Sequence, residues 1–82
     1  MRIDWDEPKR LANIDKHGLD FADLSLEFFV DAIVRPARTG RVQAIGHFAG
    51  GAISVVFIAL GTEAISVISM RPASSKERRL LS

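Results

Sequence analysis

The sequence predicts an α+β fold, in which a small antiparallel sheet of about four main strands carries two N-terminal helices on one face and a short C-terminal helix follows. Three observations predict it. Apolar residues stand at helical spacing in residues 7–30, they alternate with a period of two in residues 32–71, and a capping box, Ser74-Ser75-Lys76-Glu77, opens the last helix. Because a chain of 82 residues has room for one core, we expect a single domain over residues 1–82.

The first helix is predicted over residues 7–17, after a brief strand over residues 2–5. Asp6 is a favourable N-cap residue, Pro8 suits the first turn, and Gly18 provides the left-handed conformation in which helices commonly end. Capping signals at both ends therefore define this helix.

A second helix is predicted from its N-cap, Asp20, to about Val30. Phe21, Leu24 and Phe28 stand at positions i, i+3 and i+7, which places their side chains on one face. The helical spacing is lost after this point, so the helix is expected to end there.

The rest of the sequence predicts four strands, over residues 32–35, 41–49, 53–60 and 64–71. Residues 41–49 alternate apolar and polar positions, which indicates a solvated face that carries Gln43, Ile45 and His47. Residues 53–60 are apolar on both faces, as expected of a central strand.

The composition excludes several classes of function. No cysteine is present, so the chain has no disulfide, no thiolate nucleophile and no cysteine-based zinc site. The two histidines, His17 and His47, are far apart in sequence, and we expect His47 at the surface or at the edge of the sheet. No glycine-rich phosphate loop connects a strand to a helix. We therefore expect neither a metal nor a cofactor.

Charge is unevenly distributed along the chain. Residues 1–31 carry four basic and eight acidic groups, whereas residues 32–82 carry seven basic and two acidic groups, which gives net charges of −4 and +5. The second part therefore favours a polyanionic partner. The first residues are charged where a secretory signal needs an apolar segment, and the longest weakly polar stretch, residues 52–60, is too short to span a bilayer. We expect a cytoplasmic protein without a membrane role.

Lys16 and His17 end the first helix and allow two interpretations. In the structural interpretation, both side chains complement the negative end of the helix dipole. In the functional interpretation, His17 is a general acid or base and Lys16 contacts a phosphate, because an imidazole transfers protons near neutral pH. The residues alone leave both interpretations open.

Four cations lie within nine residues near the end of the sequence: Arg71, Lys76, Arg78 and Arg79. One interpretation is a solvated helix face, and the other is a phosphate-binding cluster. Arg71 belongs to a largely apolar strand, where a guanidinium normally has an anionic partner. Glu77 and a bound phosphate are the two candidates for that partner.

Three segments have the order and spacing of a known family. They are Trp5-Asp6-x-x-Lys9-x-x-x-Asn13-x-x-Lys16-His17-Gly18-Leu19-x-Phe21, then Phe29-x-Asp31, and Ile68-Ser69-Met70-Arg71-Pro72-Ala73 with Glu77-Arg78-Arg79. They resemble the BrnT family, small ribonuclease toxins of bacterial type II toxin–antitoxin modules. The resemblance extends over both ends and most of the chain, and it is specific because many positions agree in order and spacing.

The resemblance implies a fold like that of the RelE-type toxins and a metal-independent ribonuclease that cleaves RNA and blocks translation. It also implies a cognate antitoxin with a ribbon-helix-helix DNA-binding domain, through which alone the toxin contacts operator DNA. The candidate catalytic residues for this activity are Lys16, His17, Arg71, Glu77 and Arg78, and the candidate RNA-binding residues are Arg71, Lys76, Arg78 and Arg79.

The sequence departs from the family pattern at Ile58, Ala59, Gly61, Ser66, Met70 and Leu81. RNA cleavage through the 2′-hydroxyl needs a base, an acid and a cation that stabilises the phosphorane. An alternative function is therefore a degenerate toxin that binds its antitoxin and tunes transcriptional repression without cutting RNA. A nucleic-acid binder without catalysis is a third hypothesis, which the aromatic content of 7% disfavours.

Overall fold

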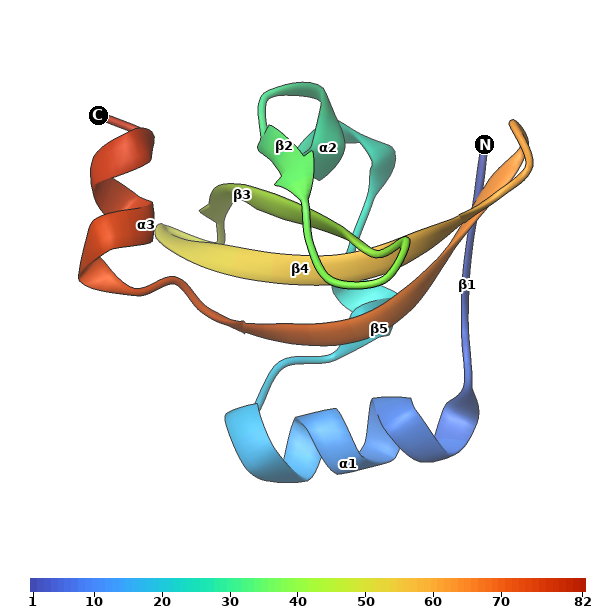
Figure 1. Ribbon diagram of the computed structural model, residues 1–82. Coiled ribbons are helices and arrows are strands. Elements are labelled where there is room, and N and C mark those ends of the chain that lie inside the picture. Colours follow the sequence, from blue (N-terminus) through green and yellow to red (C-terminus); the bar gives the residue numbers. More distant parts are fainter.

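The computed structural model describes residues 1–82 and contains one five-stranded sheet with the strand order β1-β5-β4-β3-β2 (Figure 1). The elements follow the chain as β1 (Arg2–Trp5), α1 (Glu7–His17), the 3-10 helix η1 (Phe21–Asp23), α2 (Leu26–Val30), β2 (Ile33–Pro36), β3 (Val42–Phe48), β4 (Gly51–Leu60), β5 (Ala64–Pro72) and α3 (Ser75–Leu80). β1 runs parallel to β5, and every other neighbouring pair is antiparallel. The predicted α+β fold is confirmed, with two short strands, β1 and β2, at the edges of the sheet.

α1 has the predicted bounds because both of its caps form. The Asp6 carboxylate accepts the Lys9 N–H at 3.3 Å. Gly18 adopts a φ of 69°, and its N–H donates to the Ile14 carbonyl at 2.8 Å. Glycine takes this left-handed conformation without the steric cost that a Cβ brings. Gly18, and not the imidazole of His17, therefore closes the helix.

The prediction of one helix from Asp20 to Val30 is wrong, because this segment forms η1 and the separate short helix α2. Asp20 caps η1 by accepting the Ala22 N–H at 2.8 Å. The backbone then becomes extended at Leu24, with a ψ of 141°. η1 contacts β5 and α2 contacts β3, so the break lets the segment cross the sheet and bury apolar side chains against both strands.

The predicted strands are all present, with bounds that differ by no more than a residue or two. β4 is the central strand, as its two apolar faces predict. β5 contains an irregularity that the sequence did not predict: Val56 pairs with Ser69 and Phe57 with Val67, so Ile68 forms a β-bulge. Bulges increase the local twist and re-aim side chains, and they are common beside active sites.

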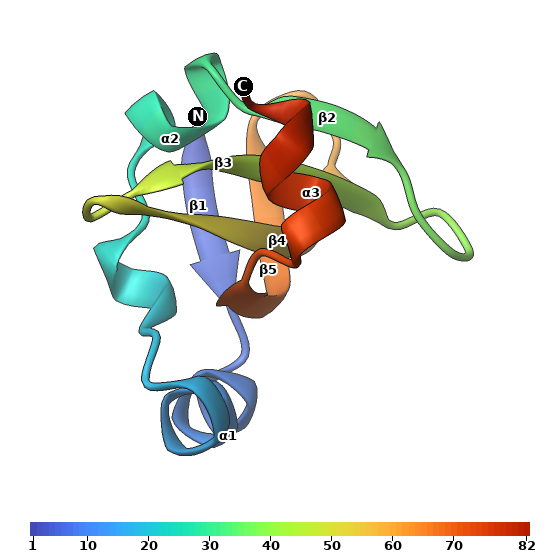
Figure 2. The same cartoon turned by 90° about the vertical axis from the view of Figure 1, so that its left-hand side faces the viewer.

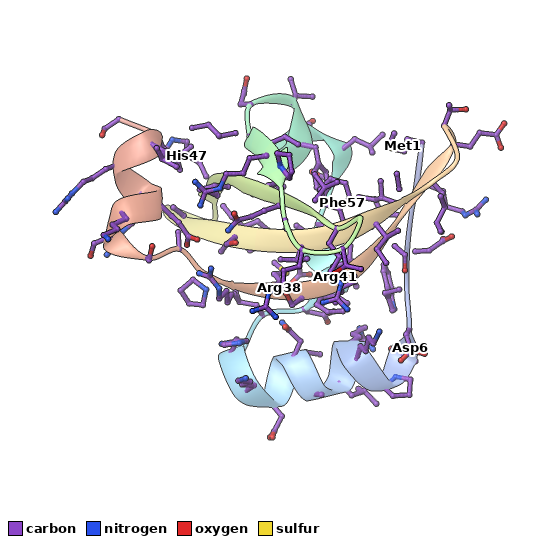
Figure 3. All side chains as sticks on the ribbon, viewed as in Figure 1. Met1, Asp6, Arg38, Arg41, His47 and Phe57 are labelled. Carbon is purple, nitrogen blue, oxygen red and sulfur yellow. The ribbon has the colours of Figure 1, made fainter.

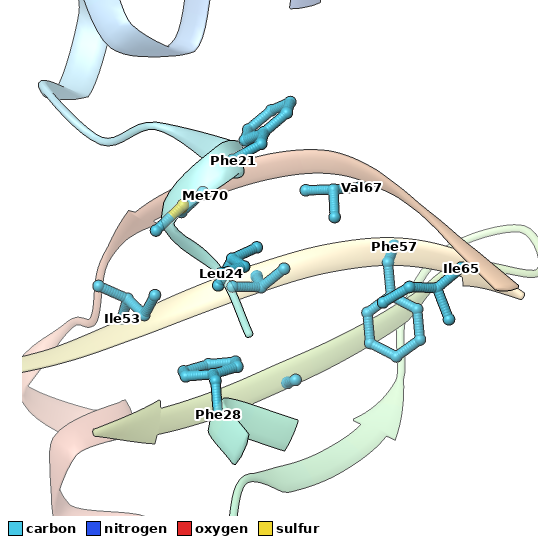
Figure 4. Packing of buried hydrophobic residues seen from close by; sticks show 10 residues of the cluster. Phe21, Leu24, Phe28, Ile53, Phe57, Ile65, Val67 and Met70 are labelled. Atoms are coloured by element: carbon cyan, nitrogen blue, oxygen red, sulfur yellow. The ribbon is translucent and has the colours of Figure 1, made fainter. Parts of the chain in front are cut away.

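Buried apolar side chains from η1, α2 and the three long strands form the core (Figure 4). The cluster consists of Phe21, Leu24, Phe28, Ala44, Ile53, Val55, Phe57, Ile65, Val67 and Met70. Phe28 lies so close to β3 that a Cβ at Gly46 would stand 2.8 Å from its ring. Packing therefore requires a glycine at position 46.

The two faces of the sheet are covered differently, with η1 and α2 on one side and α3 on the other (Figure 2). Ile45, which the alternating pattern places on a solvated face, is fully buried. This prediction is wrong: α3 lies on this face of the sheet, where its Glu77 bonds Gln43 of β3, and the strand pattern does not show that a helix returns to it. His47 is exposed, as expected. None of the helices has the length and apolar character of a membrane span.

Candidate functional site

Polar side chains gather on the face of the sheet that α3 covers only in part. Alternation along the strands places Arg35 of β2, Gln43 of β3, Ser54 of β4, and Ser69 and Arg71 of β5 on this face. We call these five residues the polar face. The register sets Arg35 opposite Gln43 and Ser54 opposite Arg71, so adjacent strands hold these side chains within reach of one another.

Glu77 of α3 holds Arg71 in place. The two terminal nitrogens of Arg71 donate to the two carboxylate oxygens of Glu77 at 2.8 and 2.9 Å, and Nη1 also donates to the Pro72 carbonyl at 3.1 Å. A fork of this kind fixes the plane of the guanidinium. The Arg71 side chain remains 41% exposed, so a further anion can still reach it. Of the two partners predicted for Arg71, the structure places Glu77 there.

Glu77 is buried, with a side-chain exposure of 9%. In addition to the two bonds from Arg71, its oxygens accept the Ser74 N–H at 2.8 Å and the Gln43 amide at 2.9 Å. The bond from Arg71 is the main reason that the pKa of Glu77 falls to about 2. The Ser74 hydroxyl in turn accepts the Glu77 N–H at 3.1 Å, which completes the predicted capping box. The carboxylate is therefore ionised near neutral pH and occupied at both oxygens.

Gln43 links three members of this network. Its amide nitrogen donates to Ser54 Oγ at 2.8 Å as well as to Glu77, and its amide oxygen accepts from Arg35 Nε at 2.8 Å. Ser54 is fully buried, so this bond satisfies its hydroxyl. Sequence reasoning missed Arg35, Gln43 and Ser54 because their approach to Glu77 follows from the strand register. Their polar character within predicted strands was the one available signal.

Lys16 and His17 lie at the C-terminal end of α1, beside the bulge in β5. They line a hollow of about 240 Å³ together with Lys9, Ala12, Asn13, Ile68 and Ser69. The His17 side chain is half-buried and Lys16 is exposed, and neither side chain forms a hydrogen bond or ion pair within the protein. Both groups are therefore available to a ligand in the hollow.

Ser69 connects this hollow with Arg71. The two residues lie on the same face of β5, two positions apart, which is about 7 Å along the strand. The end of α1 that carries His17 and the start of α3 lie at the same end of β5 (Figure 1). The structure thus brings Lys16, His17, Arg71 and Glu77 to one end of the sheet.

The other predicted cations lie outside the Arg71 network. Lys76, Arg78 and Arg79 are exposed on α3 and form no ion pair. Arg78 lines a different hollow, of about 330 Å³, together with His47 and Leu81. No group of three or more His, Cys, Asp or Glu side chains is arranged to hold a metal ion.

The positions where the sequence departs from the family pattern lie mostly at the other end of the sheet. Ile58, Ala59, Gly61 and Ser66 surround the turn between β4 and β5. Ile58 is four residues along β4 from the strand partner of Arg71, a separation of about 13 Å. None of these four residues contacts the Arg71 network.

Comparison with known proteins defines the class of this chain. Residues 5–77 match the family described as "Ribonuclease toxin, BrnT, of type II toxin-antitoxin system". The 1.1 Å crystal structure of the Brucella abortus ribonuclease toxin BrnT is 59% identical and has a TM-score of 0.86, over 92% of this chain and 99% of that chain. A search among curated proteins found no match. The match over nearly the whole chain places it among the ribonuclease toxins of type II toxin–antitoxin systems. Within that class, the chain belongs to the BrnT family.

Proposed function

We propose that this chain is an endoribonuclease whose cleavage site is the end of the polar face around Arg71, and that it cleaves RNA without a metal ion and thereby blocks translation. The observation that carries the proposal is the Arg71 guanidinium, which Glu77 fixes while 41% of the side chain stays exposed. Membership of a ribonuclease-toxin family indicates the class of reaction.

Cleavage through the 2′-hydroxyl requires two proton transfers. A base accepts the 2′-hydroxyl proton as the oxygen attacks phosphorus, and an acid protonates the departing 5′-oxygen as the P–O bond breaks. The products are a 2′,3′-cyclic phosphate and a 5′-hydroxyl. We assign these proton transfers to His17, assisted by Lys16, because both side chains are unbonded and line the hollow that adjoins Ser69.

Arg71 supplies the cation that stabilises the phosphorane. Its bonds to Glu77 fix the guanidinium before RNA arrives, so little reorganisation is needed when negative charge develops. Glu77 acts through Arg71, because its oxygens are occupied and its lowered pKa makes it a poor base at neutral pH. We therefore propose that Glu77 positions the Arg71 guanidinium and does not itself transfer a proton.

Arg71, Lys76, Arg78 and Arg79 are proposed to bind the RNA backbone. α3 presents the last three to solvent without ion pairs, which leaves them free for phosphates. Arg78 is also a candidate for catalysis, but it lies beside His47 and outside the Arg71 network. Its position supports RNA binding better than a part in the chemistry.

A type II toxin has a cognate antitoxin. We propose that this antitoxin carries a ribbon-helix-helix DNA-binding domain and that the toxin reaches operator DNA only through it. A segment that covers the polar face would block access of RNA to Arg71. Co-expression with the adjacent reading frame should yield a stable complex, and a toxin chain that purifies alone and harmlessly at high expression would contradict the proposal.

The test of catalysis uses the purified chain, freed from antitoxin, and a labelled RNA in excess chelator. We expect cleavage that leaves a 2′,3′-cyclic phosphate, and no cleavage at a position where a 2′-deoxynucleotide replaces the scissile ribonucleotide. The same preparation should stop protein synthesis in a cell-free translation system. Cleavage that requires an added metal ion, or that continues at the deoxy position, would contradict the mechanism. Absence of any cleavage would favour the alternative, a chain that binds its antitoxin and tunes repression.

A further inference from the structure

The turn between β2 and β3 carries two arginines in a fixed geometry. The Arg41 N–H donates to the Arg38 carbonyl at 2.9 Å, and the two residues between them, Thr39 and Gly40, have φ values of 48° and 73°. Positive φ at both central positions is the pattern of a type I′ turn, which keeps its first and last residues close together. A β-branched residue such as Thr39 seldom adopts this conformation, and strained backbone of this kind is commonest at functional sites.

Arg38 and Arg41 have no anionic partner. Both are exposed, and neither takes part in an ion pair, although Arg2, Arg10, Arg35 and Arg71 all do. Like charges held side by side in a hairpin destabilise it. The structure therefore keeps two exposed arginines without an anionic partner at the two ends of a tight turn, where a bound anion would offset their mutual repulsion.

The turn continues the polar face. Gln43 of β3 lies on the face that carries Arg35 and Arg71, and Arg41 ends the turn directly before β3, two residues from Gln43. The turn passes in front of the sheet in Figure 1, and the Arg38 and Arg41 side chains extend from it on the side away from α2 (Figure 3). Arg71 pairs with Ser54 of β4, which in turn pairs with Ile45 of β3. Arg41 is four residues before Ile45, so its backbone lies two strands across and four residues along from Arg71, a separation of about 16 Å.

We propose that Arg38 and Arg41 form a second phosphate-binding subsite, which holds the backbone of a single RNA strand a few nucleotides away from the phosphate at Arg71. This inference rests on the proposed function, because it extends the RNA path from the cleavage site. The cations from the turn to the cleavage site on this face are Arg38, Arg41, Arg35 and Arg71. The planar fork of an arginine matches the two oxygens of a phosphodiester. The buried Glu77 network, through Gln43 and Arg35, joins the cleavage site to this hairpin.

The test measures binding of a fluorescent 12-nucleotide RNA over a range of salt concentrations, with Arg38→Ala, Arg41→Ala and the double variant. Removing one phosphate-binding cation flattens the slope of log K against log salt by about 0.7 for a single strand, so we expect about 1.4 for the double variant. Arg38→Lys with Arg41→Lys should keep most of the slope. Arg2→Ala is the matched control, because Arg2 is an exposed arginine on β1, at the opposite edge of the sheet. The salt slope of Arg2→Ala should equal that of the parent.

Cleavage supplies a second measurement. The double variant should raise KM for the 12-nucleotide RNA with kcat unchanged, and it should cleave a dinucleotide with one phosphate as fast as the parent does, because that substrate does not reach the turn. A parental salt slope in the double variant, an equal flattening by Arg2→Ala, or weakened antitoxin binding with intact RNA binding would overturn the inference. A parent that binds the RNA but does not cut it contradicts the proposed function. The salt slopes then still show whether Arg38 and Arg41 bind phosphates.

Discussion

The side-chain amide of Asn13 pairs with the backbone of Met70 as a neighbouring strand would. Its oxygen accepts the Met70 N–H at 3.1 Å, and its nitrogen donates to the Met70 carbonyl at 2.9 Å. β1 pairs with β5 only from Ala64 to Val67, so the edge of β5 is free at Met70. The same amide donates to the Leu19 carbonyl at 2.9 Å. One buried side chain therefore fixes α1, with Lys16 and His17, against the strand that carries Arg71.

Replacing Asn13 tests this anchor. In Asn13→Ala, the N–H and carbonyl of Met70 have no partner in a buried setting, at a cost of about 1–3 kcal/mol for each unsatisfied group. We expect the free energy of unfolding in urea to fall by about 2–4 kcal/mol. Asp15→Ala, an exposed change on the same helix, is the control and should change it by less than about 0.5 kcal/mol. Equal effects of the two substitutions would contradict the anchoring role.

The ion pair of Glu77 and Arg71 makes stability depend on pH. The hydrogen bond from Arg71 is the main cause that lowers the pKa of Glu77 from 4.5 to about 2 in the folded state. A lowered folded-state pKa means that the stabilisation is complete above pH 4.5 and is lost as the pH falls from 4.5 toward 2. After allowance for solvent screening, the contribution is about 2 kcal/mol.

Urea unfolding of the parent and of Glu77→Gln at several pH values measures this contribution. We expect the parent to be the more stable at pH 7, and the difference between the two proteins to shrink steadily between pH 4.5 and 2. The pKa of Asp20, which Arg10 lowers, gives the same direction of pH dependence in both proteins, so it cancels in the difference. A difference that stays constant over this range would show that the carboxylate of Glu77 is not linked to folding.

Arg71→Lys separates the charge of Arg71 from its geometry. A lysine keeps the positive charge but cannot form the two parallel bonds to Glu77, so the cation is no longer fixed where charge develops. Loss of one such stabilising group typically costs about 10²–10³ in kcat, and we expect a loss of this size in RNA cleavage. Arg2→Lys, at an exposed position on β1 at the opposite edge of the sheet, is the control and should leave kcat unchanged. Thermal melts of both variants show whether a rate loss reflects unfolding.

Local interactions account for what the sequence predicted correctly. The bounds of α1 follow from Asp6 and Gly18, and the start of α3 follows from Ser74 and Glu77, in each case through interactions within a few residues. Arg71 and Glu77 are six residues apart, and for that reason the sequence could suggest Glu77 as one of two partners.

The features that the sequence did not predict depend on residues far apart in the chain. Gln43 reaches Glu77 across 34 positions, and Asn13 reaches Met70 across 57. The bulge at Ile68 and the break near Leu24 depend on how neighbouring elements pack, because the local pattern at each fits a regular strand or helix equally well. Strand register and packing therefore determine which side chains surround Arg71. The sequence identified Arg71 and Glu77 as candidates, but it did not identify Gln43 as the residue that joins them to β3.

His17→Gln distinguishes catalysis from helix capping. The structure is compatible with both interpretations, because His17 lies in the last turn of α1, where a cation complements the helix dipole, and its imidazole forms no hydrogen bond within the protein. If His17 moves protons, glutamine keeps its approximate size but cannot accept and return a proton, and cleavage should fall by about 10²–10⁴-fold. The free energy of unfolding should change by less than about 1 kcal/mol.

Lys16→Gln is the matched control, since it removes a cation from the adjacent position in the same hollow. It should weaken RNA binding and lower the salt slope by about 0.7, because one phosphate-binding cation is removed. It should also lower the cleavage rate far less than His17→Gln does, because a lysine that assists as a cation does not carry the proton. Unchanged cleavage in His17→Gln, measured per folded molecule, would remove His17 from the reaction and leave Arg71 as the centre of a site whose proton-transfer groups lie elsewhere. A loss of stability that explains the whole loss of rate would instead assign His17 to the structure of α1.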